Sequence, residues 1–234
     1  VNYNTVQGWN GNIGLTFFQA YGETRSRYLR IHSTFEYGVS DQRLRPTAGI
    51  TYNYNRNNNS FVGFFAGNAA TQYNRSEPIS PLINSIATLF FERNYMKVFD
   101  LTYVKANWGQ ELFNGLYLHA STGYEKRKPL FNTTDYVVIP NDEVDFTVNN
   151  PRPSENGITP VDILPHDIIK SKLNAYVTFG QKYYSYPDGK VNMGGNKYPR
   201  LRLEFENGLG ASLSDYNYSQ LNAYVAQNVS CLLY

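Results

Sequence analysis

RLRLEFENG, at residues 200–208, alternates charged and apolar side chains and ends in an Asn-Gly pair. Successive side chains of a β-strand point to opposite faces, so a strand here has one charged and one apolar face. The charged face carries Arg200, Arg202, Glu204 and Glu206, and the apolar face carries Leu201, Leu203 and Phe205. If the apolar face packs on a core, the chain is an ordinary soluble β-protein. If it meets lipid, the charges line the inside of a β-barrel.

The same period-two alternation recurs along the chain and predicts strands. In residues 28–38, for example, Leu29, Ile31 and Phe35 lie opposite Arg30 and Glu36. Nine strands are expected, at residues 13–21, 28–38, 47–55, 61–73, 99–107, 115–127, 168–185, 200–208 and 216–227.

The lengths of these strands favour a membrane-spanning barrel. Soluble strands average about five or six residues, whereas a tilted strand needs about 9 to 11 residues to cross a bilayer. The connections GETRS (22–26) and RNNN (56–59) are short, and residues 131–166 form a long polar loop. Short turns on one side and long loops on the other are typical of outer-membrane barrels. A large β-sandwich with one long loop is the alternative, because alternation by itself fits both folds.

One segment breaks the β pattern and predicts a helical insertion at residues 80–96. Leu82, Ile83, Ile86, Leu89 and Phe90 have the spacing of one helical face. The preceding Ser-Pro pair is a start signal, since serine caps free amides and proline suits the first turn. In a barrel this amphipathic helix could lie in the lumen or at the membrane interface.

Composition excludes several classes of protein. The net charge of +2, with dispersed Lys and Arg, argues against nucleic acid as a partner. A single cysteine, Cys231, excludes an internal disulfide framework. No apolar run approaches the roughly 20 residues of a membrane-spanning helix. The chain opens on VNYNTVQGW without an initiator Met or signal peptide, so we expect the interior of a longer precursor.

The sequence contains no persuasive constellation of catalytic or metal-binding residues. His32, His119 and His166 are far apart and offer no metal-ligand spacing, so neither a metal nor another cofactor is expected. Glu204 and Glu206 could serve glycoside hydrolysis, but they alternate with apolar residues beside two arginines. Such charges more often pair across strands. We therefore expect no enzymatic activity.

The chain is rich in aromatic residues, with 21 tyrosines. Some of them could stack on sugars, and in a soluble or surface-attached β-sandwich they would make a glycan-binding module. In a barrel, tyrosines near strand ends form the aromatic girdle at the lipid–water boundary. The tyrosines considered are Tyr52, Tyr54, Tyr183, Tyr184 and Tyr186.

Four blocks together resemble a family of outer-membrane β-barrel proteins of Bacteroidota. They are NTVQGWN (4–10), LFFERNYMKVFD (89–100), ELFNGLYLHASTGYEKRKPLFNTTDY (111–136) and KYPRLRLEFENGLG (197–210). In that family, whose biochemical role is uncharacterised, the barrel follows a signal peptide and a carboxypeptidase-regulatory-like β-sandwich domain. The resemblance implies a location and an architecture, and it carries over no catalytic residue. Since single-chain bacterial barrels have even strand numbers, nine strands imply an incomplete barrel.

These observations predict an all-β protein, an antiparallel transmembrane β-barrel with one short amphipathic helix. The chain is expected to be a single barrel domain, residues 1–234, from a longer protein in the bacterial outer membrane. Its expected partners are outer-membrane lipid and other envelope proteins, and its role transport, assembly or structural. The charged side chains expected to face the lumen are Arg30, Glu36, Glu125, Arg127, Arg200, Arg202, Glu204 and Glu206.

Overall fold

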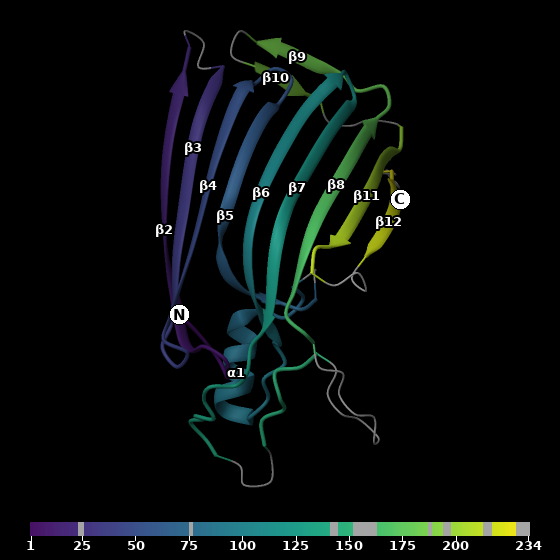
Figure 1. Ribbon diagram of the computed structural model, residues 1–234. Coiled ribbons are helices and arrows are strands. Elements are labelled where there is room, and N and C mark those ends of the chain that lie inside the picture. Colours follow the sequence, from purple (N-terminus) through teal and green to yellow (C-terminus); the bar gives the residue numbers. More distant parts are fainter. Residues whose placement is uncertain are drawn as a thin grey trace, which may run out of the picture.

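The structure is a computed structural model of the chain, dominated by one large antiparallel sheet of ten strands (Figure 1). It describes residues 1–22, 26–74, 77–140, 145–151, 163–186, 189–193, 198–212 and 217–227. The sheet is not closed: β2 and its short partner β1 lie at one edge, and β12 lies at the other. The all-β class and the antiparallel pairing are thus confirmed, whereas closure into a barrel is not present in the described residues.

The strands follow one another in the sheet in chain order, β1-β2-β3-β4-β5-β6-β7-β8-β11-β12, and β9 and β10 form a separate hairpin. Their bounds are β1 Asn2–Asn4, β2 Gly8–Tyr21, β3 Arg27–Gly38, β4 Arg43–Asn55, β5 Ser60–Gln72, β6 Val98–Phe113, β7 Leu116–Pro129, β8 His166–Thr178, β9 Tyr183–Tyr186, β10 Gly189–Asn192, β11 Arg200–Gly210 and β12 Tyr218–Ala226. The helix α1 spans Pro81–Phe91.

Each predicted strand corresponds to one of the nine long strands of the sheet, but one prediction was too long. The segment 168–185 is not continuous, because β8 ends at Thr178 and Gly180 turns the chain with a φ of 61°. A positive φ is incompatible with an extended strand. Tyr183 to Tyr186 belong instead to β9, which pairs with β10. The short β1 was not predicted.

The helix is also shorter than the predicted 80–96. Pro81 opens it after Ser80, whose side chain makes no capping hydrogen bond. It ends at Phe91 because Glu92 adopts a left-handed conformation (φ 53°) and its N–H bonds to Ala87 O. Among its buried residues are Asn84, Ser85 and Thr88, so the helix packs its polar side inward.

The turns follow the predicted asymmetry only in part. The connections after β2 and β4 are short and lie at the end of the sheet away from α1, and the described parts of the long 130–165 segment lie at the α1 end (Figure 1). However, residues 39–42 make a short turn at the α1 end, and the β8–β11 connection, which carries the β9–β10 hairpin, is long at the other end.

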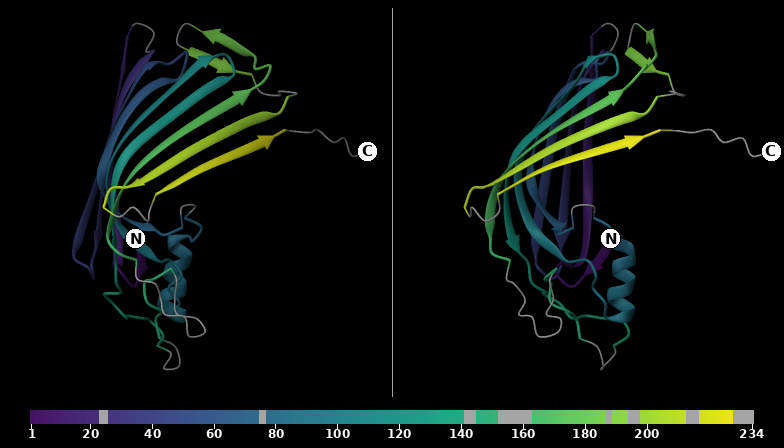
Figure 2. Two further views of the ribbon diagram at one scale, coloured as in Figure 1. Left: turned by 45° about the vertical axis from the view of Figure 1, so that its right-hand side comes forward. Right: turned by 90° about the vertical axis from the view of Figure 1, so that its right-hand side faces the viewer.

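The sheet is strongly curved (Figure 2), and its register sorts side chains into two faces. Cross-strand partners share a face, so the continuous pairing across the sheet aligns the polar positions of all nine long strands. The polar face is concave, because one cavity is lined by residues of six adjacent strands on that face. All eight side chains predicted to face the lumen lie on this polar face.

The opposite, outward face is apolar and exposed. Ile13 is 69% exposed, Val104 60% and Leu221 72%. Leu203 and Phe205, on the apolar side of residues 200–208, are likewise exposed, so no core covers them in the described part of the chain. The exposed apolar residues of this outward face include Ile13, Leu15, Phe17, Ile31, Phe35, Leu44, Ile50, Phe64, Val104, Ile169, Leu173, Leu203, Phe205, Leu209, Leu221 and Val225.

A small core lies at the α1 end, where the sheet splits. Pairing between β4 and β5 stops at Thr47 and Gly67. Next to this split, Val6, Met96, Val98 and Leu130 form the buried apolar cluster, with Ala70 and Ile79 packed on it. The N-terminal segment, α1 and the loops around them therefore form an end cap on the sheet. No helix within the described residues is long and apolar enough to cross a membrane.

Candidate functional site

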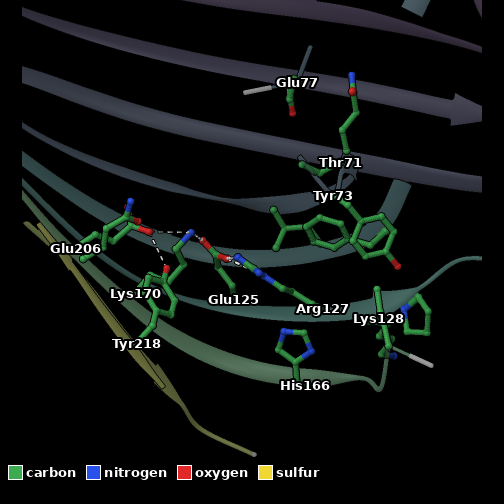
Figure 3. Close-up of a pocket in the computed structure, with 16 residues that line it drawn as sticks. Thr71, Tyr73, Glu77, Glu125, Arg127, Lys128, His166, Lys170, Glu206 and Tyr218 are labelled. Carbon is green, nitrogen blue, oxygen red and sulfur yellow. Dashed lines mark hydrogen bonds and ion pairs between the residues drawn. The ribbon is translucent and has the colours of Figure 1, made fainter. Parts of the chain in front are cut away.

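The polar face carries a continuous run of ion pairs across β7, β8 and β11 (Figure 3). Arg127 Nη2 lies 2.5 Å from Glu125 Oε2, and the other oxygen of Glu125 lies 3.7 Å from Lys170 Nζ. Lys170 also lies 3.8 Å from Glu206. The hydroxyl of Tyr218, on β12, donates to Glu206 Oε1 at 2.7 Å. Four strands are therefore joined by charged contacts on this face.

Lys172 extends the same run toward the other end of the sheet. Its Nζ lies 3.8 Å from Glu206 Oε2 and 2.8 Å from Glu204 Oε1, and Arg202 Nη2 lies 2.6 Å from Glu204 Oε2. Glu204 and Glu206 are buried, and a buried carboxylate stays charged only with such partners. We call these seven side chains the charge ladder: Arg127, Glu125, Lys170, Glu206, Lys172, Glu204 and Arg202.

The ladder contains five of the eight residues predicted to face a lumen, namely Glu125, Arg127, Arg202, Glu204 and Glu206. The other three share the polar face but not the ladder. Arg30 lies over the rings of Phe18 and Tyr28, 5.9 and 5.8 Å from their centroids. Glu36 accepts a hydrogen bond from Gln7 Nε2. Arg200 lies exposed at the start of β11.

The prediction missed the two lysines that connect the carboxylates. Lys170 and Lys172 alternate with Ile169, Ser171 and Leu173, so the period-two signal that identified Arg202 was present here too. Their role depends on β8 lying between β7 and β11. That adjacency joins residues separated by long loops, and a single strand's pattern does not reveal it.

A cavity of about 660 Å³ lies beside the ladder at the α1 end of the polar face. Figure 3 shows Glu125, Arg127, Lys170, Glu206 and Tyr218 along it. Since each of these charged groups is engaged by an opposite charge or a hydroxyl, the ladder behaves as a polar wall of paired charges. Glu204 and Glu206, considered above for hydrolysis, are held by lysines.

The histidines are spread over the polar face. The ring of His32 lies between two hydroxyls, with Nδ1 2.9 Å from Thr16 Oγ1 and Nε2 3.0 Å from Thr34 Oγ1. His119 stacks on Phe61 with ring centroids 6.0 Å apart. Among the residues that the structure describes, no group of three or more His, Cys, Asp or Glu side chains could hold a metal ion. Cys231 lies outside the described residues.

The end cap is built from buried amides and hydroxyls. Asn84 Nδ2 donates to Asn94 Oδ1 at 2.8 Å, and Asn84 Oδ1 accepts from Met96 N at 2.9 Å. Asn94 Nδ2 donates to Thr5 Oγ1 at 2.5 Å. The backbone oxygen of Thr5 in turn accepts from Thr133 N at 2.8 Å. Three of the sequence blocks, 4–10, 89–100 and 111–136, thus meet here, although they are distant in the chain.

Lys97 lies at the edge of the end cap, next to the start of β6. Burial lowers the pKa of Lys97 to about 8. Its Nζ donates to Thr147 O at 3.1 Å and to Thr147 Oγ1 at 2.6 Å. Lys97 therefore ties the 130–165 segment to the start of β6.

Asn149 offers a test of how much the cap contributes to stability. Its buried amide donates to Val98 O at 2.7 Å and to Leu130 O at 2.6 Å, and it accepts from Val98 N at 2.9 Å. Asn149→Ala should lower the free energy of unfolding by about 2–4 kcal/mol, because three buried backbone groups lose their partner. Urea denaturation measures this change. The exposed neighbour Val148→Ala should change it by less than about 0.5 kcal/mol, and equal effects would contradict the assignment.

Comparison with the curated proteins found no match, and neither did comparison with the solved structures. A family model does match, and it covers residues 1–234, the whole chain. Its description is a family of unknown function, DUF5686, C-terminal domain. The chain therefore belongs to the DUF5686 family and corresponds to its C-terminal domain.

Proposed function

We propose that this chain forms the wall of a bacterial outer-membrane β-barrel, with a non-enzymatic role in transport, assembly or the structure of the cell envelope. The observation that carries the proposal is the outward face. Its aliphatic and phenylalanine side chains are exposed on eight of the nine long strands, and soluble monomers rarely expose so large an apolar patch. Lipid is the solvent in which such a face is stable.

The aromatic residues on the outward face support the same proposal. Tyr52, Tyr54 and Trp108 gather toward the end away from α1, where Trp108 Nε1 donates to Tyr54 Oη at 3.2 Å. Toward the α1 end, Tyr124 precedes Lys126 and Lys128 at the next two outward positions of β7. An apolar band with aromatic residues at its borders and charges beyond it is the pattern of a barrel's lipid-facing surface.

The polar face supports the interior side of the wall. The charge ladder and the hydroxyls beside it could not face lipid without a large desolvation cost. Facing a water-filled lumen, they remain solvated and paired. Backbone groups at the two sheet edges also need partners in a bilayer. We therefore propose that further strands pair with β2 and β12 and complete the barrel.

The resemblance described above extends the proposal to the whole protein. It implies an outer-membrane protein of Bacteroidota in which this domain follows a carboxypeptidase-regulatory-like domain. The partners proposed are outer-membrane lipid and other envelope proteins. The other reading, a soluble sandwich, needs a second sheet packed on Leu203 and Phe205, and the described residues place none there.

Boiling-dependent gel migration tests the barrel. Full-length protein extracted from membranes should run at a different apparent mass unheated than after boiling, because a closed barrel resists SDS until its hydrogen-bonded strands melt. It should also remain in the membrane fraction after a high-salt wash. A full-length protein that partitions into the soluble fraction and gives one band under both conditions would overturn the proposal.

A further inference from the structure

A second cavity, of about 410 Å³, lies on the polar face at the end away from α1. It is separate from the charge ladder's cavity, and its walls come from the six neighbouring strands β3 to β8, from β10 and from the loops beside them. The register explains why these residues meet. Tyr28, Asn53 and Phe61 are consecutive cross-strand partners, and Tyr117 is paired directly with Tyr176.

Aromatic rings form one side of this cavity. Tyr28, Phe61, Tyr117 and Tyr176 all line it, and the rings of Tyr117 and Tyr176 lie 6.0 Å apart at an interplanar angle of 51°. The site requires the glycine at position 109: a Cβ there would lie 2.3 Å from Tyr117 Oη and 2.4 Å from Phe61 Cε1. Because Gly109 has no side chain, the rings of Phe61 and Tyr117 have room to lie next to its backbone.

A buried polar group in the same cavity has no partner. Asn53 is only 4% exposed, and its Oδ1 has no hydrogen-bond partner among the described residues. An unpaired buried acceptor costs about 1–3 kcal/mol, and such an atom in a native protein calls for an explanation. Oδ1 is itself enclosed, so a hydrogen-bond donor on a ligand would satisfy it once the Asn53 amide rotates to present this oxygen to the cavity.

The charges around the cavity argue for a neutral ligand. Its carboxylate, Glu111, is already engaged, since Oε1 accepts from Gly115 N at 3.1 Å and Oε2 pairs with Lys190. The side chains of Gln181 and Asn192, which complete the lining, are uncharged amides. A purely apolar ligand would leave Asn53 Oδ1 unsatisfied. A flat aromatic ligand would favour parallel rings over the tilted pair found here.

We propose that this cavity binds a neutral saccharide, one of whose hydroxyl groups donates to Asn53 Oδ1 while its C–H face packs on Tyr117. The aromatic rings supply apolar contact, and the amides fix orientation through hydrogen bonds, as in other small-molecule sites. This inference rests on the proposed function, because only a closed barrel places the cavity in an interior. It deepens that function by naming the class of molecule that the interior would bind.

The test is isothermal titration calorimetry, which measures the binding affinity of full-length protein in detergent. The ligands are neutral hexasaccharides of glucose (α- and β-linked), xylose and mannose. At least one of them should bind. Tyr117→Ala should weaken that binding at least tenfold, and Tyr117→Phe less than threefold. Tyr52→Ala is the matched control, because Tyr52 precedes Asn53 on β4 but faces outward, and it should leave binding unchanged.

Asn53→Leu should weaken binding without damaging the fold. Leucine has a similar volume and removes an unpaired buried acceptor, so the variant should be at least as stable as the wild type while binding the saccharide at least tenfold more weakly. Failure of every hexasaccharide to bind, or unchanged binding by Asn53→Leu and Tyr117→Ala, would overturn the inference. Heat-modifiable migration of the same samples reports on the barrel separately, so the two proposals can fail independently.

Discussion

Leu221→Arg should reduce the amount of heat-modifiable protein in the outer membrane at least tenfold. Leu221 lies on the outward face of β12 and is 72% exposed. In lipid, an arginine at a strand's outward position costs about 2–4 kcal/mol near the bilayer midplane, and each 1.4 kcal/mol is about a factor of ten in an equilibrium constant. In water the same substitution at so exposed a position would cost less than about 0.5 kcal/mol.

Asn222→Arg is the matched control. Asn222 is the next residue of the same strand, but its cross-strand partner is Glu204, on the polar face. An arginine there faces the charge ladder, so the amount of membrane-inserted protein should stay within twofold of the wild type. Membrane fractionation followed by gels of boiled and unboiled samples measures both variants. If Leu221→Arg assembles as well as Asn222→Arg, the outward face does not meet lipid.

Arg45→Met should lower the free energy of unfolding by about 3–5 kcal/mol, the usual cost of removing one partner from a buried ion pair. The side chain of Arg45 is fully buried at the α1 end of β4. Its Nη2 lies 2.5 Å from Asp41 Oδ2, and its Nε lies 3.5 Å from Asp100 Oδ1. Methionine fills a comparable space but leaves both carboxylates without their cation.

Two further variants separate lost charge from lost packing. Arg43→Met, two residues earlier on the same strand but exposed, should change stability by less than about 0.5 kcal/mol. Adding Asp41→Asn and Asp100→Asn to Arg45→Met should restore part of the loss, since no uncompensated carboxylate remains. The midpoint temperature of the heat-modifiable transition measures each variant. A triple variant less stable than Arg45→Met would assign the loss to packing instead of charge.

Arg45 also illustrates what the sequence did not reveal. In residues 43–55 it is one more charged residue at an alternating position. It becomes the largest fully buried side chain among the described residues because β4 and β5 separate below Thr47 and Gly67, which brings Asp100 of β6 next to it. The split depends on the end cap, whose contacts join residues distant in sequence.

The second cavity, for which a saccharide ligand is proposed, shows a similar limit of prediction from the sequence. From the sequence alone, the candidate sugar-binding residues are Tyr52, Tyr54, Tyr183, Tyr184 and Tyr186. The first two lie on the outward face and the other three lie in the β9–β10 hairpin. The aromatic residues that line the cavity come from different strands and are aligned only by the register of the sheet. Composition counts tyrosines but does not assign them to a face until the strands are paired.

The sequence by itself determined the nine long strands, the position of the helix and the segregation of polar from apolar side chains. These are local properties, since a strand's faces follow from its period of two residues. Only the tertiary structure decided which residues meet: the lysines between the carboxylates, the buried arginine in the split, the cap built from three distant blocks and the aromatic cavity.

For RLRLEFENG, alternation separates the charges from the apolar residues. The curvature of the sheet and the neighbouring strands place the charges in a paired, concave wall and leave Leu203 and Phe205 exposed on the convex side. The sequence of this segment could not determine that outcome, because pairing and curvature depend on strands far away in the chain.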